Sequence, residues 1–204
     1  MKENKKEKIL KIAAKYFAKH GFDSTSLDHI AKEAKITKAA IYYHFKDKAS
    51  LYEEVLNKRL KILNIFLQEE LKNKKDPKER LKTYIITFGE FLNENGCFAA
   101  ILAHEFADNG KNMPKSSVKL LSNTLGTVTS ILNEGIKQKE FKMENPMAIQ
   151  LMIVSTLIMH QTTKDLRAKV SSLVEGFEIL PEPNIKDLSI ILAKKILKSI
   201  EKEK

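Results

Sequence analysis

Six side chains share the outward face of a short predicted helix near residue 40. They are Thr37, Lys38, Ala39, Tyr42, Tyr43 and His44. Hydroxyl, ammonium, phenol and imidazole groups are poorly suited to burial, but they can form hydrogen bonds with phosphate oxygens and with the edges of bases. The chemistry of this face is therefore that of a surface which contacts nucleic acid.

Residues 25–48 supply the elements that would hold this face in place. They predict two short helices joined by a tight turn, followed by the start of a third helix. The inward-facing residues at helical spacing are Leu27, Ile30, Ala31, Ile36, Ile41 and Phe45. This set packs one helix across the other, and the small Ala31 lets the two backbones approach closely. The pattern is that of a helix-turn-helix whose second helix enters the major groove.

Two stretches in the first quarter of the chain carry a family resemblance, FAKHGFDSTSLDHIAKEA and ITKAAIYYHFKDKASL. They resemble the DNA-binding domain of TetR-family transcriptional regulators. Two residues depart from the family pattern. Lys35 stands in the turn where the family usually has Gly, so we expect Lys35 to adopt a left-handed or distorted conformation at some cost. Ala39 replaces a common Gly near the start of the recognition helix.

The resemblance also implies roles for individual residues. Contacts to phosphates are expected from Thr25, Tyr42, His44 and Lys48. Contacts to base edges are expected from Thr37, Lys38 and Ala39. Among these, Lys38 is the expected reader of guanine, while Tyr43 could reach either bases or phosphates.

The charge of the chain agrees with this assignment without proving it. The 204 residues carry a formal net charge of +10. Residues 1–50 contain 12 Lys and 6 acidic residues, which gives +6 and concentrates the excess near the suspected DNA-binding segment. A Lys-rich, solvated surface would give the same charge, so the helix-turn-helix pattern carries the argument.

The remaining sequence predicts an all-α fold. Only 7 Gly and 5 Pro interrupt long runs with helical periodicity. Further helices are expected at about residues 48–71, 78–93, 97–107, 114–139, 145–161 and 184–200, with irregular or broken helix at 163–183. We assign residues 1–47 to a helix-turn-helix DNA-binding domain and residues 48–204 to a helical regulatory and dimerisation domain. The resemblance implies that the last two helices form a four-helix dimer interface, and the segment 147–159 is too apolar for one face to bury.

Other sequence features concern the cellular compartment. The single Cys97 excludes an internal disulfide and fits a reducing environment. The basic amino terminus lacks the apolar stretch of a signal peptide, and the longest apolar run is shorter than the roughly 20 residues of a membrane span. A cytoplasmic protein is expected.

A mixed set of aromatic, Met and polar residues suggests a ligand pocket in the second domain. The set is Phe88, Phe91, Phe98, His104, Glu105, Phe106, Met152 and His160. Apolar walls with a few polar groups are typical of small-molecule sites, although the aromatic residues could equally be core and His160 a buried core histidine. His104, Glu105 and Asp108 do not form an HExxH zinc motif, so no metal site is assigned.

These observations predict a homodimeric transcriptional regulator, most simply a repressor. It would bind a palindromic operator and be released by a small, largely apolar effector. No convergent set of acid, base and nucleophile is present, so no catalytic residue and no cofactor is assigned. One alternative is a constitutive dimeric DNA-binding protein without a ligand, and a remote one is an enzyme docked to DNA.

Overall fold

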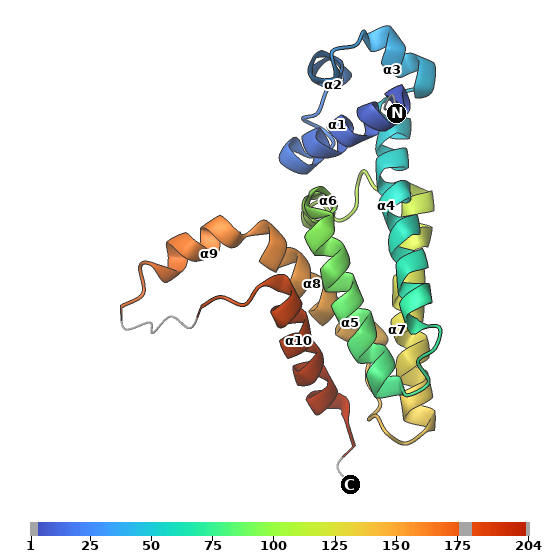
Figure 1. Ribbon diagram of the computed structural model, residues 1–204, viewed down its shortest axis with the longest axis vertical. Coiled ribbons are helices and arrows are strands. Elements are labelled where there is room, and N and C mark those ends of the chain that lie inside the picture. The colour runs from blue at the N-terminus through green and yellow to red at the C-terminus, as the bar shows by residue number, and fades with distance from the viewer. Residues whose placement is uncertain (1–3, 176–180, 203–204) are drawn as a thin grey trace. The chain divides into compact units, whose positions relative to one another are not determined.

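The computed structural model describes residues 4–175 and 181–202, which are almost entirely helical (Figure 1). The helices in this part of the chain are α1 (Lys5–His20), α2 (Leu27–Ala34), α3 (Lys38–His44), α4 (Lys48–Leu71), α5 (Pro77–Glu94), α6 (Gly96–Ala107), α7 (Lys115–Lys137), α8 (Pro146–Thr162), α9 (Lys164–Ser171) and α10 (Ile185–Ile200). The prediction of an all-α fold with an amino-terminal three-helix segment is confirmed.

The chain forms two compact units, and each is built from two separate stretches of sequence. The first unit combines residues 1–62 with residues 97–121, and the second combines residues 63–96 with residues 122–204. Helices α4 and α7 therefore contribute residues to both units. The predicted boundary after residue 47 separates two expected functions, whereas the compact units are defined by contacts between residues. The predicted boundary therefore stays a prediction.

Helices α1, α2 and α3 form the amino-terminal part of the first unit (Figure 1). Each begins with a side chain that satisfies an otherwise unpaired backbone N–H. Asn4 accepts from Lys6, Ser26 from His29 and Thr37 from Ala40. The cap of α2 is thus Ser26 and not the neighbouring Thr25.

An aromatic cluster fills the core of the first unit beneath α1. The ring of Tyr52 lies edge-on to Phe17, with centroids 4.7 Å apart, and 4.9 Å from Phe22. Its hydroxyl donates a hydrogen bond of 2.5 Å to Oε1 of the buried Glu105 on α6. Burial, followed by the bond to this carboxylate, raises the pKa of Tyr52 well above its usual range. The phenol therefore stays protonated and remains a donor.

A second polar link in the first unit joins α4 to the start of α7. The Asn57 amide donates to Oγ of Ser116 at 2.8 Å, and its carbonyl accepts from Oγ of Ser117 at 2.7 Å. Because Ser117 is fully buried, losing this partner would leave a hydroxyl without compensation. Residues far apart in sequence thus complete a single core.

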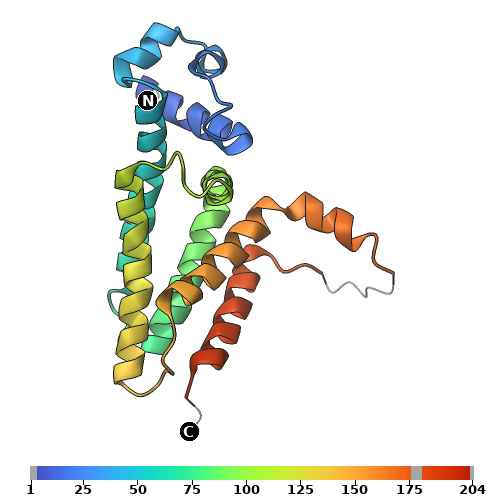
Figure 2. The ribbon, with the colours of Figure 1, turned by 180° about the vertical axis from the view of Figure 1, so that it is seen from behind.

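The second unit is organised around helices α5, α8 and α10, which pack against one another (Figure 2). Asn184 caps helix α10, because its side chain accepts a hydrogen bond from the backbone N–H of Asp187. Helices α5 and α10 approach most closely at Gly89, where a Cβ atom would lie 2.0 Å from Oγ of Ser189. Only glycine fits there, so this position fixes the spacing of the two helices.

Phe141, just after α7, closes the lower end of the second unit. Its ring is fully buried against the backbone of Gly135, where a Cβ atom would lie 2.1 Å from Cδ2 of the ring. Beside it, Lys142 N–H donates to Ile200 at 2.7 Å and Lys202 N–H donates to Glu140 at 3.0 Å. These bonds tie the loop after α7 to the chain that leaves α10.

A polar chain runs through the core of the second unit. The Tyr84 hydroxyl donates to Oε1 of Gln150 at 3.1 Å, and the Gln150 amide lies 3.4 Å from Oγ1 of Thr124. Burial raises the pKa of Tyr84 to about 12. The link joins α5, α7 and α8 through groups that would be costly to leave unpaired.

The predicted irregular segment at residues 163–183 contains one short helix, α9, while residues 176–180 of that segment lie outside the described residues. Arg167 on α9 hydrogen-bonds to the carbonyl of Met159 and to Glu182. In the described part of the chain, every helix is too short or too polar to cross a bilayer.

Candidate nucleic-acid interface and ligand site

The outward face of α3 is held in place by two buried residues, one on the helix and one directly after its end. Ile41 and Phe45 are almost fully buried, and they point into the core while their neighbours face outward. Thr37 caps the helix through a 3.2 Å bond from the Ala40 N–H to its Oγ1. A short helix is marginal without such tertiary support, so these contacts fix the orientation of the exposed face.

The turn before α3 contains the left-handed residue predicted from the sequence. Lys35 has φ 54° and ψ 47°, and its N–H bonds to the carbonyl of Lys32 at 3.1 Å. The following N–H, from Ile36, reaches back to the carbonyl of Ala31 at 3.0 Å. These are the bonds of a helix that ends through a left-handed residue, where glycine is favoured. The prediction for Lys35 is confirmed.

We expect Lys35→Gly to stabilise the protein by about 0.5–1 kcal/mol, because glycine adopts positive φ without the steric cost of a Cβ atom. The gain is reduced by the greater freedom of glycine in the unfolded chain. Urea unfolding at equilibrium measures the difference. Lys35→Ala is the control, since it removes the same charged group but retains the strain; equal stabilities of the Gly and Ala variants would contradict the prediction.

The outward face of α3 is accessible to a partner. Thr37, Lys38, Ala39 and Tyr42 are exposed, and Tyr43 is the most exposed of the aromatic residues that the structure describes, at 85% of its maximum exposure. His44 is half-buried, and its ring stands perpendicular to that of Tyr43 at 5.0 Å. Six of the eight predicted DNA-contacting residues are thus brought together on one short helix and its cap.

Lys38 is engaged within the protein. Its Nζ lies 2.8 Å from Oδ2 of Asp28 on α2. The hydrogen bond to this carboxylate, and then its charge, raise the pKa of Lys38. Since the pair is solvent-exposed, it contributes little to stability. To contact a base, Lys38 must break its ion pair with Asp28 and bond to the base edge instead. Asp28 therefore competes with DNA for this side chain.

The two remaining predicted DNA contacts are tied to the loop between α1 and α2. Thr25 is only 3% exposed, and its hydroxyl donates to the carbonyl of Gly21 at 2.7 Å. The side chain thus turns inward to satisfy the loop, and a contact of Thr25 with a phosphate stays a prediction. Lys48 donates to the carbonyls of Phe22 and Asp23 at 2.8 and 3.3 Å, with its Nζ 4.2 Å from the centroid of the Phe22 ring.

The predicted ligand-binding residues are divided between the two compact units. Phe98, His104, Glu105 and Phe106 belong to the first unit, whereas Phe88, Phe91, Met152 and His160 belong to the second. Phe88, Phe91 and Phe98 are buried, while Phe106 and Met152 are exposed. A pocket formed by these eight residues stays a prediction, because helical spacing shows that residues share a face without showing which faces meet.

The polar members of that set have partners of their own. Glu105 accepts from Tyr52, and Nε2 of His104 lies 3.1 Å from the carbonyl of Ala18. Nε2 of His160 lies 2.9 Å from the carbonyl of Pro183. His160 thus anchors the segment before α10 through Nε2, while its buried Nδ1 has no hydrogen-bond partner among the described residues, so both interpretations of this histidine stay predictions.

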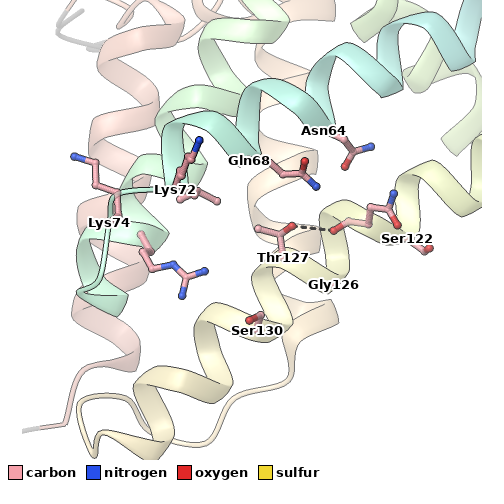
Figure 3. A pocket seen from close by; sticks show the side chains of 11 residues that line it. Asn64, Gln68, Lys72, Lys74, Ser122, Gly126, Thr127 and Ser130 are labelled. Carbon is pink, nitrogen blue, oxygen red and sulfur yellow. Dashed lines mark hydrogen bonds between the residues drawn. The ribbon is translucent and has the colours of Figure 1, made fainter.

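A different cavity, which is widely open to solvent and has a volume of about 760 Å³, is lined by residues of the second unit (Figure 3). Helix α4 contributes Asn64, Gln68 and Leu71, with Lys72 directly after its end, and helix α7 contributes Ser122, Asn123, Gly126, Thr127 and Ser130. Lys74 and Arg80 complete its wall. None of the eight predicted ligand residues lines it. Sequence reasoning missed the site because only apolar faces were examined, although polar residues recur every four positions along both helices.

Comparison with known proteins agrees with this architecture. The family described as "Bacterial regulatory proteins, tetR family" matches residues 9–55, which include the helix-turn-helix. The fatty acid metabolism regulator protein of Bacillus subtilis (strain 168) is 24% identical over 182 residues, 85% of this chain and 94% of that protein. The regulator AcrR of Shigella flexneri is 48% identical over 50 residues, but these span only 23% of its length and 24% of this chain.

Solved structures show the same fold over the whole chain. A HlyIIR mutant covers 98% of this chain and 97% of its own, with a TM-score of 0.72 and 24% identity. FadR from Bacillus subtilis in complex with stearoyl-CoA covers 96% of this chain and 99% of its own, with a TM-score of 0.74 and 20% identity. Such relatives are transcriptional regulators rather than enzymes. Residues 9–55 thus match the tetR family of bacterial regulatory proteins, and the whole chain shares the fold of solved transcriptional regulators such as FadR.

Proposed function

We propose that the protein is a homodimeric repressor that binds a palindromic operator through α3 and is controlled by a small effector. The observation that carries the DNA-binding part is the exposed polar face of α3, held by a capped and buried frame. Two such faces related by a two-fold axis would read half-sites about one helical turn apart, or a multiple of it.

Dimerisation is supported by the second face of α8. Ile149, Ile153 and Leu157 are buried within the protomer, but Leu151, Met152 and Met159 remain exposed. An apolar helix face of this kind is typical of a protein–protein interface. A second copy of the chain, with its own α8 and α10, would cover it.

Control by an effector is supported by the 760 Å³ cavity, whose size lies within the range of small-molecule sites. A constitutive DNA-binding protein would have no use for such a space, so the cavity favours the ligand-responsive function over that alternative. The effector must bind the two dimer arrangements unequally in order to change operator affinity.

Operator binding is tested with inverted repeats from the DNA that flanks the gene, measured by fluorescence anisotropy against a scrambled duplex. We expect Lys38→Ala to weaken operator binding by about 5–150-fold and to relax preference at one base position. Lys61→Ala is the matched control, because it removes the same positive charge from an exposed position on α4. Equal losses in the two variants, or equal affinity for operator and scrambled DNA, would exclude the assigned role of α3.

A further inference from the structure

The cavity of the second unit is bounded by two facing polar strips. On α4, Asn64 and Gln68 are four residues apart, and Lys72 follows just after the end of this helix. On α7, Ser122, Gly126 and Ser130 follow one another at intervals of four residues. Residues spaced by four lie on one face of a helix, so each helix borders the space between them with hydrogen-bonding or small groups (Figure 3). The apolar residues Val128, Ile131 and Leu132 lie in the core of the same unit.

The charges on the wall have one sign. Among the described residues that line the cavity there are three cations, Lys72, Lys74 and Arg80, and no carboxylate. Leu71 is the single large apolar side chain in this lining. A concave surface that carries charge of one sign concentrates ligands of the opposite sign. The wall therefore matches an anion and offers little to an extended hydrocarbon.

Two of the cations are held by carboxylates just outside the lining. Lys74 lies 2.6 Å from Oε1 of Glu79, and Arg80 donates from Nη1 to Glu134. The buried Nε of Arg80 has no hydrogen-bond acceptor. A buried donor without an acceptor is costly, and a second planar acceptor at the wall would pair with the guanidinium fork. Arg80 is thus positioned by Glu134 but retains donor capacity.

We propose that this cavity binds a hydrophilic anion, a small molecule that carries phosphate or carboxylate groups together with hydroxyl or amide groups. The cations would hold the acidic groups, and the amides and hydroxyls of α4 and α7 would bind the rest. The inference rests on the proposed function in that this anion would be the effector. A hydrophilic anion would take the place of the largely apolar effector expected from the sequence. Helix α4, which has residues in both units, would transmit the effect of binding to the DNA-binding segment.

The choice of probes distinguishes a site that binds phosphate groups from one that binds carboxylate groups. Pyrophosphate and citrate represent the two acidic groups, coenzyme A adds hydroxyl and amide groups to phosphates, and 1-octanol is the apolar probe. Binding to the full-length dimer is measured by isothermal titration calorimetry at constant ionic strength in phosphate-free buffer. We expect at least one of the three anions to bind stoichiometrically and 1-octanol not to bind.

Gly126 allows the site to be blocked without disturbing the fold. A Cβ atom at this position would meet nothing within 4 Å, and the replacement of a helical glycine favours the helix. We expect Gly126→Glu to weaken binding of the anion at least about tenfold through repulsion, and Gly126→Gln, of equal size, to weaken it less. Gly96→Glu adds the same charge at another open helical glycine, outside the cavity lining, and should leave the affinity unchanged.

The outcomes separate this inference from the proposed function. Failure of all three anions to bind, or equal affinity in wild type, Gly126→Glu and Gly96→Glu, would overturn the anion site even if operator binding were intact. Binding with the expected order of variants would establish the site even if the operator experiment failed. A bound anion that leaves operator affinity unchanged would overturn its role as effector.

Discussion

Phe141→Ala is expected to destabilise the protein by about 3–5 kcal/mol, since removal of a fully buried aromatic ring leaves a cavity as well as losing apolar contact. The ring closes the end of the second unit where the loop after α7 meets the chain after α10. Equilibrium unfolding in guanidinium chloride, followed by circular dichroism, measures the change. A loss below about 1 kcal/mol would show that the ring is not part of the core.

Gly135 supplies the matched test of the same contact. Gly135→Ala alone should cost about 1–3 kcal/mol, because its Cβ would overlap the Phe141 ring. In the double variant the ring is absent and the methyl group has room. We therefore expect the two losses to be strongly non-additive, with Gly135→Ala neutral or stabilising in the Phe141→Ala background. Simple additivity would contradict the packing described here.

Leu151→Asp is expected to weaken dimerisation by at least about 100-fold, because a carboxylate would be buried without a partner in the proposed interface. Operator affinity should fall with it, since each half-site would bind a single protomer. The leucine is 63% exposed in the protomer, so its replacement should leave the fold of the isolated chain intact. Sedimentation equilibrium and operator titration at the same protein concentration measure both effects.

Ile65→Asp on α4 is the control for this experiment, since Ile65 is equally exposed, at 61%. It should leave both the dimer and operator binding intact. Ile153, although on the same helix as Leu151, is unsuitable because it is fully buried in the protomer, and a charge there would unfold the second unit. A wild-type monomer at micromolar concentration, or equal effects of Leu151→Asp and Ile65→Asp, would refute the proposed interface.

Local patterns were sufficient to predict the recognition segment. Thr37 as a cap and Ile41 with Phe45 as inward anchors depend on neighbours within a few residues, and each has its predicted place. Even the left-handed Lys35 follows from local chemistry, because a turn between two crossing helices needs one residue with positive φ. The inward turn of Thr25 was not predictable, because its partner is the backbone carbonyl of Gly21.

The ligand site depends on contacts between distant segments, which periodicity does not encode. Phe88 and Phe98 lie at helical spacing on faces that suggested a pocket, but both are buried in the cores of different units. The strip formed by Ser122, Gly126 and Ser130 has the composition of an ordinary solvated face. Only the position of α4 opposite α7 in the second unit turns that strip into the wall of a cavity.

The discontinuity of the first unit has a consequence for biosynthesis. Glu105, the partner of Tyr52, and Ser117, the partner of Asn57, are translated long after the helix-turn-helix. At roughly 5–20 residues per second, the 59 residues from 62 to 121 take about 3–12 seconds to synthesise. During that interval the nascent chain carries the recognition helix with Phe17, Phe22 and Tyr52 incompletely covered. The ribosome thus exposes an unfinished DNA-binding unit, and chaperones that bind apolar segments have their opportunity before residue 121 is made.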